Sequence, residues 1–181
     1  MKCFLKVFVG ILTVLISVDT VFAQTERGDK EFSNSVSFMS VKYEHADEYM
    51  WVLNLATRLG FFVTKNIEVE PEIQFTKYKE EDAGVFFSGN IAYNFSLTSQ
   101  EGRLVPFVLG GFGFSNATMI APNIPYTSWE DKNWTVLNLG GGLKIFVPKP
   151  IALRLEYRFQ NWFGNPNYTY HNIFFGISVF F

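Results

Sequence analysis

The sequence is nearly devoid of cysteine, since Cys3 is the only one among 181 residues. It lies in an N-terminal segment with the pattern of an export signal, so we expect the mature chain to contain neither a thiol nor a disulfide. Covalent cross-links are thereby excluded as a source of stability. A lipoprotein signal places its cysteine directly after the cleavage point, and the position of Cys3 argues against lipidation.

Long apolar runs are also scarce. Residues 7–18 form an apolar stretch behind two lysines, and a small-x-small cleavage site ends at Ala23. The stretch is shorter than the roughly 20 residues of a spanning helix. The pattern therefore predicts a cleaved signal peptide at residues 1–23 and a single mature domain at residues 24–181. Because no other run is long enough for a transmembrane helix, the mature chain can meet a membrane only with strands.

The chain carries no strong excess of charge of one sign. The predicted signal holds two of the 15 basic residues and one of the 17 acidic ones, which leaves 13 basic and 16 acidic residues in the mature chain. This balance offers no basic surface to a nucleic-acid partner. Aromatic residues, by contrast, make up 18% of the chain and include 21 phenylalanines, which argues against disorder.

Segments with the pattern of β-strands recur along the mature chain, with turn residues between them. Each is at or above the roughly 9–11 residues that a tilted strand needs to cross a bilayer. The predicted strands are residues 34–44, 50–62, 67–78, 85–97, 104–118, 134–147, 151–162 and 171–181. They predict an all-β fold, namely an eight-stranded antiparallel up-and-down transmembrane β-barrel.

Apolar and polar residues alternate in most of these strands. Residues 67–78 are the clearest case, with one face formed by Ile67, Val69, Pro71, Ile73 and Phe75 and the other by Glu68, Glu70, Glu72, Gln74 and Thr76. Residues 151–162 repeat the pattern. A period of two places such faces on opposite sides of a sheet.

Three places depart from the alternation. In residues 34–44 the apolar face switches between Phe38 and Met39, as a β-bulge would cause. In residues 104–118 both faces are apolar or glycine, so the pattern assigns neither face. Pro71 lies within a strand, where proline is tolerated at a bulge or where its missing N–H is not needed.

A membrane barrel turns its polar faces into the lumen. The lumen would then hold four acids and four bases, which are Glu68, Glu70, Glu72, Glu156, Arg58, Lys144, Arg154 and Arg158. The third and seventh strands lie opposite each other in a ring of eight, so we expect the glutamates of 67–78 to face Arg154 and Arg158 and to fill the narrow lumen. The alternative is a soluble lipocalin-like barrel that exposes these charges to water.

The connections tend to alternate in length. The short ones are 63–66, 98–103 and 148–150, and the others are 45–49, 79–84, 119–133 and 163–170. Short turns on one side and longer loops on the other are typical of transmembrane barrels. The aromatic residues at or beyond the long-loop ends, which we expect to form an interfacial girdle, are Trp51, Trp129, Trp134, Trp162, Tyr49, Tyr168 and Tyr170. Loops 119–133 and 163–170 are the predicted surfaces for an extracellular ligand.

The last predicted strand has an apolar face from Ile173 to Phe181. Together with the signal, the strand count, the loop asymmetry and the segment Pro106-Phe107-Val108-Leu109-Gly110-Gly111-Phe112-Gly113, it resembles the OmpA/OmpX-type outer-membrane barrels of Gram-negative bacteria. The resemblance covers the whole mature chain. It implies location in the outer membrane, contact with its lipid and lipopolysaccharide, and recognition of residues 170–181 by the barrel-assembly machinery.

The two histidines, His45 and His171, flank the first and last predicted strands, which become neighbours when a barrel closes. They could meet at the outer rim near Glu44, Asp47 and Glu48 as a metal or hydrolytic site, or be two exposed rim residues. Barrel enzymes that trim lipid A resemble this architecture and use histidine and serine, but the chain has no compact His-x-Ser pattern. We therefore expect a structural or loop-binding barrel with no catalytic residue, cofactor or metal. The alternative is a lipid-modifying barrel enzyme.

Overall fold

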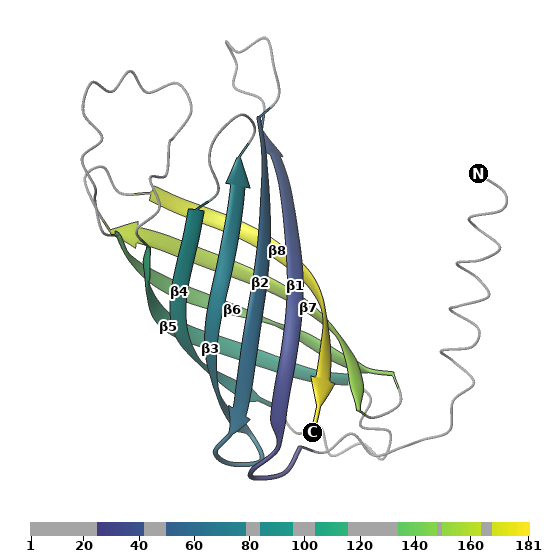
Figure 1. The fold of residues 1–181 in the computed structure, drawn as a ribbon. Helices are drawn as coiled ribbons and strands as arrows, with labels where there is room; N and C mark the ends of the chain where they lie inside the picture. The colour runs from purple at the N-terminus through teal and green to yellow at the C-terminus, as the bar shows by residue number, and fades with distance from the viewer. Residues whose placement is uncertain are drawn as a thin grey trace, which may run out of the picture.

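The computed structural model describes residues 25–41, 50–78, 84–95, 104–115, 134–147, 150–163 and 168–181. They form the strands β1 (Lys30–Val41), β2 (Met50–Phe62), β3 (Ile67–Tyr78), β4 (Gly84–Asn94), β5 (Leu104–Ser115), β6 (Trp134–Phe146), β7 (Ile151–Phe163) and β8 (Tyr168–Phe180). Each strand pairs antiparallel with its neighbours in sequence, and β1 pairs with β8, so the sheet closes into a barrel (Figure 1). The predicted fold is confirmed.

Among the described residues, no helix is long and apolar enough to cross a membrane.

The observed strand bounds agree best with the predicted ones at β2 and β3. They agree least at β1 and β8, the two strands that pair to close the barrel. β1 begins at Lys30 and β8 at Tyr168, both earlier than predicted. Because Trp162 pairs with Tyr168 and Asn161 with Thr169, the connection between β7 and β8 is only residues 164–167. The predicted long loop 163–170 is therefore wrong, since the strand-forming residues on either side of the turn continue the ladder.

The predicted length contrast between the two ends of the barrel is weaker than expected. β4 ends at Asn94, so the connection to β5 covers residues 95–103 and is longer than residues 79–83 between β3 and β4. Loop 119–133 lies outside the described residues.

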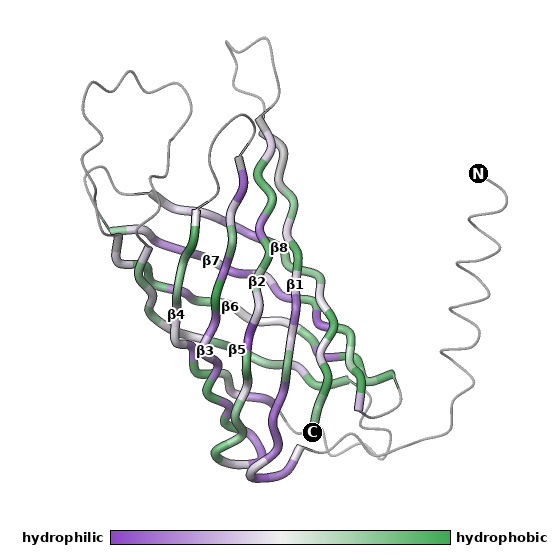
Figure 2. Tube along the Cα trace, viewed as in Figure 1, coloured by the Kyte–Doolittle hydropathy of each residue, from purple (hydrophilic) through white to green (hydrophobic). Residues whose placement is uncertain are grey.

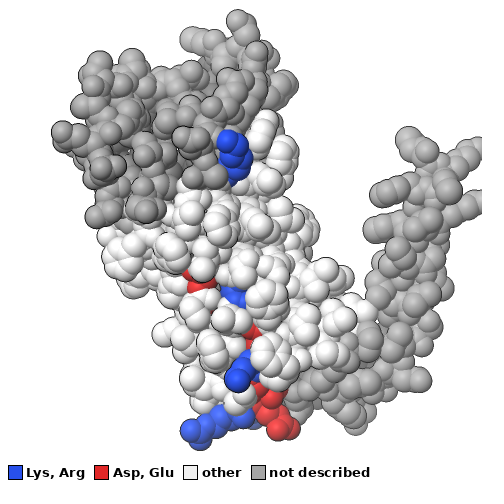
Figure 3. Space-filling model, in the orientation of Figure 1, with Lys and Arg blue, Asp and Glu red and all other residues white. Residues whose placement is uncertain are grey.

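The two faces of the wall have opposite chemistry. Large apolar side chains such as Leu55, Ile91 and Phe175 point outward and are exposed, whereas the buried set is dominated by polar and charged side chains. Figure 2 shows the resulting alternation of hydrophilic and hydrophobic residues along the strands, and Figure 3 shows one face of the barrel with most of its visible charge toward the lower end. A soluble barrel has the reverse arrangement, so the wall is built to face lipid.

The register corrects one of the three irregularities and explains another. β1 pairs with β2 without interruption from Lys30 opposite Phe61 to Val41 opposite Met50, so the predicted bulge between Phe38 and Met39 is wrong on this side of β1. The change of pattern there comes without an extra residue in the ladder.

Pro71 interrupts the ladder between β2 and β3 without shifting it. Arg58 pairs with Glu72 and Phe61 with Val69 in the same register, while the two pairs between them, Leu59–Pro71 and Gly60–Glu70, are missing. Proline has no N–H to donate to β2, and this accounts for a local gap rather than a bulge.

The structure assigns the two faces of β5 that the sequence left open. Phe107 and Leu109 point inward, and Phe112 points outward. Gly111 and Gly113 also lie on the inner face, where an added Cβ would approach the side chains of Asn90 and Phe86 to 2.3 Å. The glycines make room for neighbouring side chains, which is why their strand shows no polar face.

The predicted aromatic girdle is wrong for two of its members. Trp162 points into the barrel with 1% of its surface exposed, and Tyr170 packs against it. Both occupy inward positions of their strands, so the period of two directs them away from lipid. Trp51 lies on the outer face at the loop end of β2 and is half-buried. The remaining predicted members are outside the described residues or side chains, namely Tyr49, Trp129, Trp134 and Tyr168.

Candidate functional site

The lumen of the barrel contains the charged residues expected there and one more. All eight predicted side chains are at most 3% exposed, and so is Glu31 of β1. Glu31 was missed because the predicted first strand began at residue 34, although its alternation with outward Phe32 was a usable signal. In the described part of the chain, five carboxylates therefore face four bases inside the barrel.

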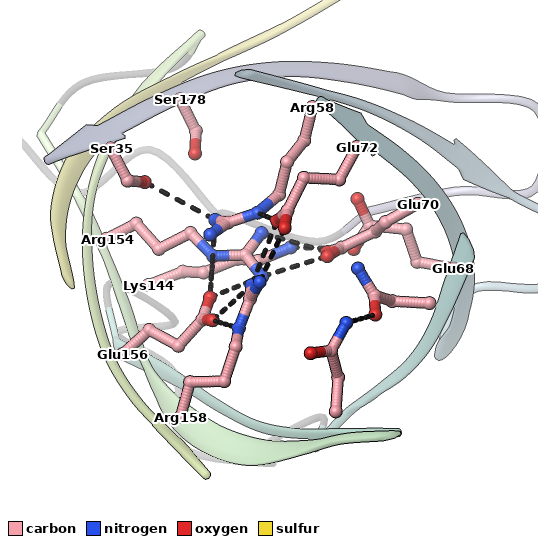
Figure 4. A network of polar contacts seen from close by, with 12 residues as sticks. Ser35, Arg58, Glu68, Glu70, Glu72, Lys144, Arg154, Glu156, Arg158 and Ser178 are labelled. Atoms are coloured by element: carbon pink, nitrogen blue, oxygen red, sulfur yellow. Dashed lines mark hydrogen bonds and ion pairs between the residues drawn. The ribbon is translucent and has the colours of Figure 1, made fainter. Parts of the chain in front are cut away.

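The lower charged cluster is organised by two bases. Lys144 Nζ lies 2.5 Å from Glu31 and 2.7 Å from Glu68. Arg154 binds Glu70 across the lumen with two hydrogen bonds of 2.8 and 3.0 Å, and it also reaches Glu31 at 3.3 Å. The paired N–H groups of a guanidinium match the two carboxylate oxygens, which makes this contact strong and directional (Figure 4).

The upper charged cluster repeats this arrangement one step higher. Arg158 donates to the two oxygens of Glu72 at 2.5 and 3.0 Å and binds Glu156 with its Nε at 2.7 Å. Arg58 adds an ion pair to Glu72 and lies 3.2 Å from Glu156. Glu156 also contacts Arg154 at 3.0 Å, so it joins the two clusters into one network. The predicted pairing of the third strand with the seventh is confirmed by Glu70–Arg154 and Glu72–Arg158.

Above the charges lies a chain of neutral polar side chains. Its hydrogen bonds run from Asn54 to Asn172, Gln160, Asn138, Asn90 and Ser88 with lengths of 2.9 to 3.3 Å. Ser88 donates to Glu72 at 3.4 Å and connects the chain to the ion pairs. Each amide is both donor and acceptor, so neighbouring amides in the chain can satisfy one another inside the lumen.

Aromatic clusters lie at both ends of this polar column. Val52, Phe86, Val136 and Trp162 form the upper one, where the rings of Phe86 and Trp162 are 5.3 Å apart. The lower one consists of Phe62, Phe146, Ala152 and Phe180, and the rings of Phe146 and Phe180 are 4.9 Å apart. Lys144 Nζ lies 5.4 Å from the ring centre of Phe62, within the range of a cation–π contact.

Strand β7 displays the whole order of the column. Its inward side chains are, from the lower end upward, Ala152, Arg154, Glu156, Arg158, Gln160 and Trp162. The column thus passes from an apolar cluster through the ion pairs and the amides to a second apolar cluster.

Three carboxylates come close enough to suggest a cation site. The oxygens of Glu31, Glu68 and Glu70 lie within 4.8 Å of one another. Lys144 and Arg154 already contact all three, so the protein's own bases supply the positive charge that a metal ion would bring.

Of the two histidines predicted to meet at the rim, only His171 lies among the described residues. His171 is the fourth residue of β8 rather than its first, points outward, and has its Nδ1 2.6 Å from the Tyr157 hydroxyl. Its ring also packs edge-on against Phe159 at 5.5 Å. His45 and its acidic neighbours Glu44, Asp47 and Glu48 lie outside the described residues.

No protein-family model matches the chain, and no curated protein matches it in sequence. Solved structures match its fold. The N-terminal β-barrel domain of Pseudomonas aeruginosa OprF is 18% identical with a TM-score of 0.58, over 87% of this chain and 100% of that one. Neisserial surface protein A is 10% identical with a TM-score of 0.54, over 84% of this chain and 96% of that one. Ail, the attachment invasion locus protein of Yersinia pestis, is 14% identical with a TM-score of 0.51, over 87% of this chain and 100% of that one.

The fold is that of an outer-membrane β-barrel. This likeness agrees with the exposed apolar wall and the charged lumen, which are the arrangement of a transmembrane barrel. The chain therefore has the fold of the integral outer-membrane barrels to which it is similar, with a wall suited to a lipid bilayer.

Proposed function

We propose that this protein is a non-conducting, non-enzymatic barrel that acts as a structural element of the outer membrane and makes contacts through its outward loops. The observation that carries this proposal is the continuous column of paired side chains between β3 and β7, bounded by an aromatic cluster at each end. Eight strands leave room for little more than their own side chains.

The column supports the absence of conduction in two ways. An ion entering the lumen would have to displace the aromatic clusters at Trp162 or Phe180, and both side chains are at least nine-tenths buried. It would then have to break bidentate pairs such as Arg154–Glu70, whose members would be left as uncompensated buried charges.

Conductance in planar lipid bilayers tests this proposal directly. We expect the purified protein to give little or no steady current. The variant E70A/R154A/W162A lacks the bidentate Arg154–Glu70 pair and the Trp162 side chain of the upper aromatic cluster. It should show more frequent channel openings than the unmodified protein. Large, stable channels formed by the unmodified protein would overturn the filled-lumen proposal.

The contact role rests on loop 119–133 and on the neighbours' outer-membrane architecture. Ail carries attachment in its name, which makes surface contact a reasonable role for a barrel of this fold. Because residues 164–167 form only a short connection, we assign the contact role to 119–133 alone.

Cells that display the protein should attach to a host-cell layer more than cells without it. Replacing 119–133 with a short glycine-serine turn should abolish this gain in attachment when the two proteins are present at equal amounts on the surface. No gain with the unmodified protein would contradict the contact role.

Lipid and lipopolysaccharide around the wall, and the barrel-assembly machinery at the last strand, are the proposed partners. The outward row of β8, which contains Ile173, Phe175, Ile177, Val179 and Phe181, supports both, because it offers a continuous apolar surface that includes two aromatic residues. The absence of lipid chemistry is also part of the proposal. Among the described residues His171 contacts the Tyr157 hydroxyl and the ring of Phe159, and it has no serine partner of the kind that lipid A-trimming barrels use. A lipid A mass spectrum that changes when the protein is expressed would favour the enzyme instead.

A further inference from the structure

A groove crosses the outer wall of the barrel over β1 to β5. Its volume is about 490 Å³, which lies within the roughly 300–1,000 Å³ of small-molecule sites. Its sides are large apolar side chains from neighbouring strands, among them Phe32, Leu59, Phe87, Phe112 and Phe114. All five point away from the lumen and are more than a third exposed.

The groove exists because two small outward residues stand side by side in the sheet. Pro71 of β3 pairs with Gly89 of β4, and Gly89 pairs with Phe112 of β5. Gly89 has no side chain, and an added Cβ would meet no atom within 4 Å. The proline ring and the glycine therefore form a low floor between Leu59 on one side and Phe112 on the other.

The floor is apolar in character although a threonine borders it. Thr57 lies on the outer face and lines the groove, but its hydroxyl donates a 2.8 Å hydrogen bond to Asn34 Oδ1 on β1. A hydroxyl facing lipid is tolerated when it has such a partner. A ligand in the groove would therefore contact mainly apolar side chains and aromatic rings. The Thr57 hydroxyl is already paired with Asn34.

We propose that this groove binds one acyl chain of a membrane lipid and holds it in place longer than the surrounding lipids. The groove belongs to the wall that faces the bilayer, so acyl chains surround it in the protein's working location. A flexible chain can follow a hollow floored by Pro71 and Gly89, whereas a second copy of the barrel would need a protruding ridge to fill it. The proposal depends on insertion in a membrane and is independent of conduction or loop contacts.

Filling the groove tests the proposal. Gly89→Leu places a side chain in open space, and Gly110→Leu is the matched control because Gly110 is an outward glycine outside the groove whose added Cβ would make an ordinary 3.6 Å contact with Leu139. Each protein is refolded into vesicles of equal parts phosphatidylcholine and phosphatidylglycerol, moved to a mild detergent, and examined by native mass spectrometry for retained lipid. Heat-modifiable gel migration confirms that all variants are folded.

We expect the unmodified protein and Gly110→Leu to retain one lipid, in the headgroup ratio of the vesicles, and Gly89→Leu to retain at least tenfold less. Equal retention by Gly89→Leu and Gly110→Leu would overturn the proposal, as would strong selection of one headgroup. A dimer that Gly89→Leu abolishes would show that the groove is a contact between copies instead.

A second pair of variants covers a failure of Gly89→Leu to fold. Phe112→Ala removes one side of the groove, and Ile177→Ala removes an equally outward side chain on β8, away from it. Retention should fall only in Phe112→Ala, and an equal effect of both substitutions would contradict the proposal.

Discussion

The inner and outer faces of β7 belong to one strand but place different requirements on their side chains. Arg154, Glu156 and Arg158 point inward, and each forms an ion pair with a residue of another strand, namely Glu70, Arg58 and Glu72 respectively. Leu153, Leu155 and Tyr157 point outward, where lipid is a fluid that adapts to many shapes. The inner face is therefore specific in its pairs, whereas the outer face requires only apolar character. Substitutions on the two faces should separate these requirements.

The largest loss is expected when an inner base is removed. Arg154→Met leaves Glu70 without its cation and removes the longer of the two ion pairs of Glu31, which keeps Lys144, and breaking a buried pair in this way costs about 3–5 kcal/mol of unfolding free energy. Leu153→Met, at the adjacent outward position, should cost less than about 1.5 kcal/mol because the volume is nearly conserved. Urea unfolding in detergent micelles measures both, and equal losses would abolish the distinction between the faces.

The next largest effect comes from placing a charge on the outer face. Leu139 lies near the middle of β6 and points outward, so Leu139→Arg should cost about 2–4 kcal/mol in lipid vesicles. Leu139→Ile is the control and should leave stability nearly unchanged. An arginine tolerated without loss would show that this part of the wall does not face hydrocarbon.

Deleting Phe181 should affect assembly more than stability. Its side chain is exposed on the outer face, and its backbone exchanges hydrogen bonds of 2.9 and 3.0 Å with Lys30. Side-chain packing there can contribute at most about 1.5–3 kcal/mol, since the residue is only partly covered. We expect a strong fall of outer-membrane insertion in cells and a much smaller loss of stability in refolded protein. Normal insertion in cells would exclude Phe181 as a recognition element.

The smallest effect among the inner charges is expected at Glu68. Among the described residues five carboxylates face four bases, and Glu68 Oε1 finds no hydrogen-bond partner there although the residue is buried. Glu68→Gln keeps an oxygen for Lys144 and balances the charges, so stability should change by less than about 1 kcal/mol. Glu72→Gln is the comparison, because Glu72 accepts from both Arg58 and Arg158. A larger loss at Glu68 than at Glu72 would refute this order of the charges.

The alternation of side chains alone determined much of this protein. It specified eight strands, the inward direction of Glu70 and Arg154, and the outward direction of Leu155 and Phe175, because a period of two is a local property of the backbone. The pairing of the third strand with the seventh followed from the number of strands in a closed ring.

Only the tertiary structure decided the features that depend on neighbours from other strands. Glu31 joined the lumen because β1 extends to pair with the end of β8, and Trp162 became part of an inner cluster because it meets Phe86 across the barrel. The groove formed because the register brings Pro71 beside Gly89 and Phe112. Register joins residues far apart in the chain, so a pattern read along one strand cannot specify it.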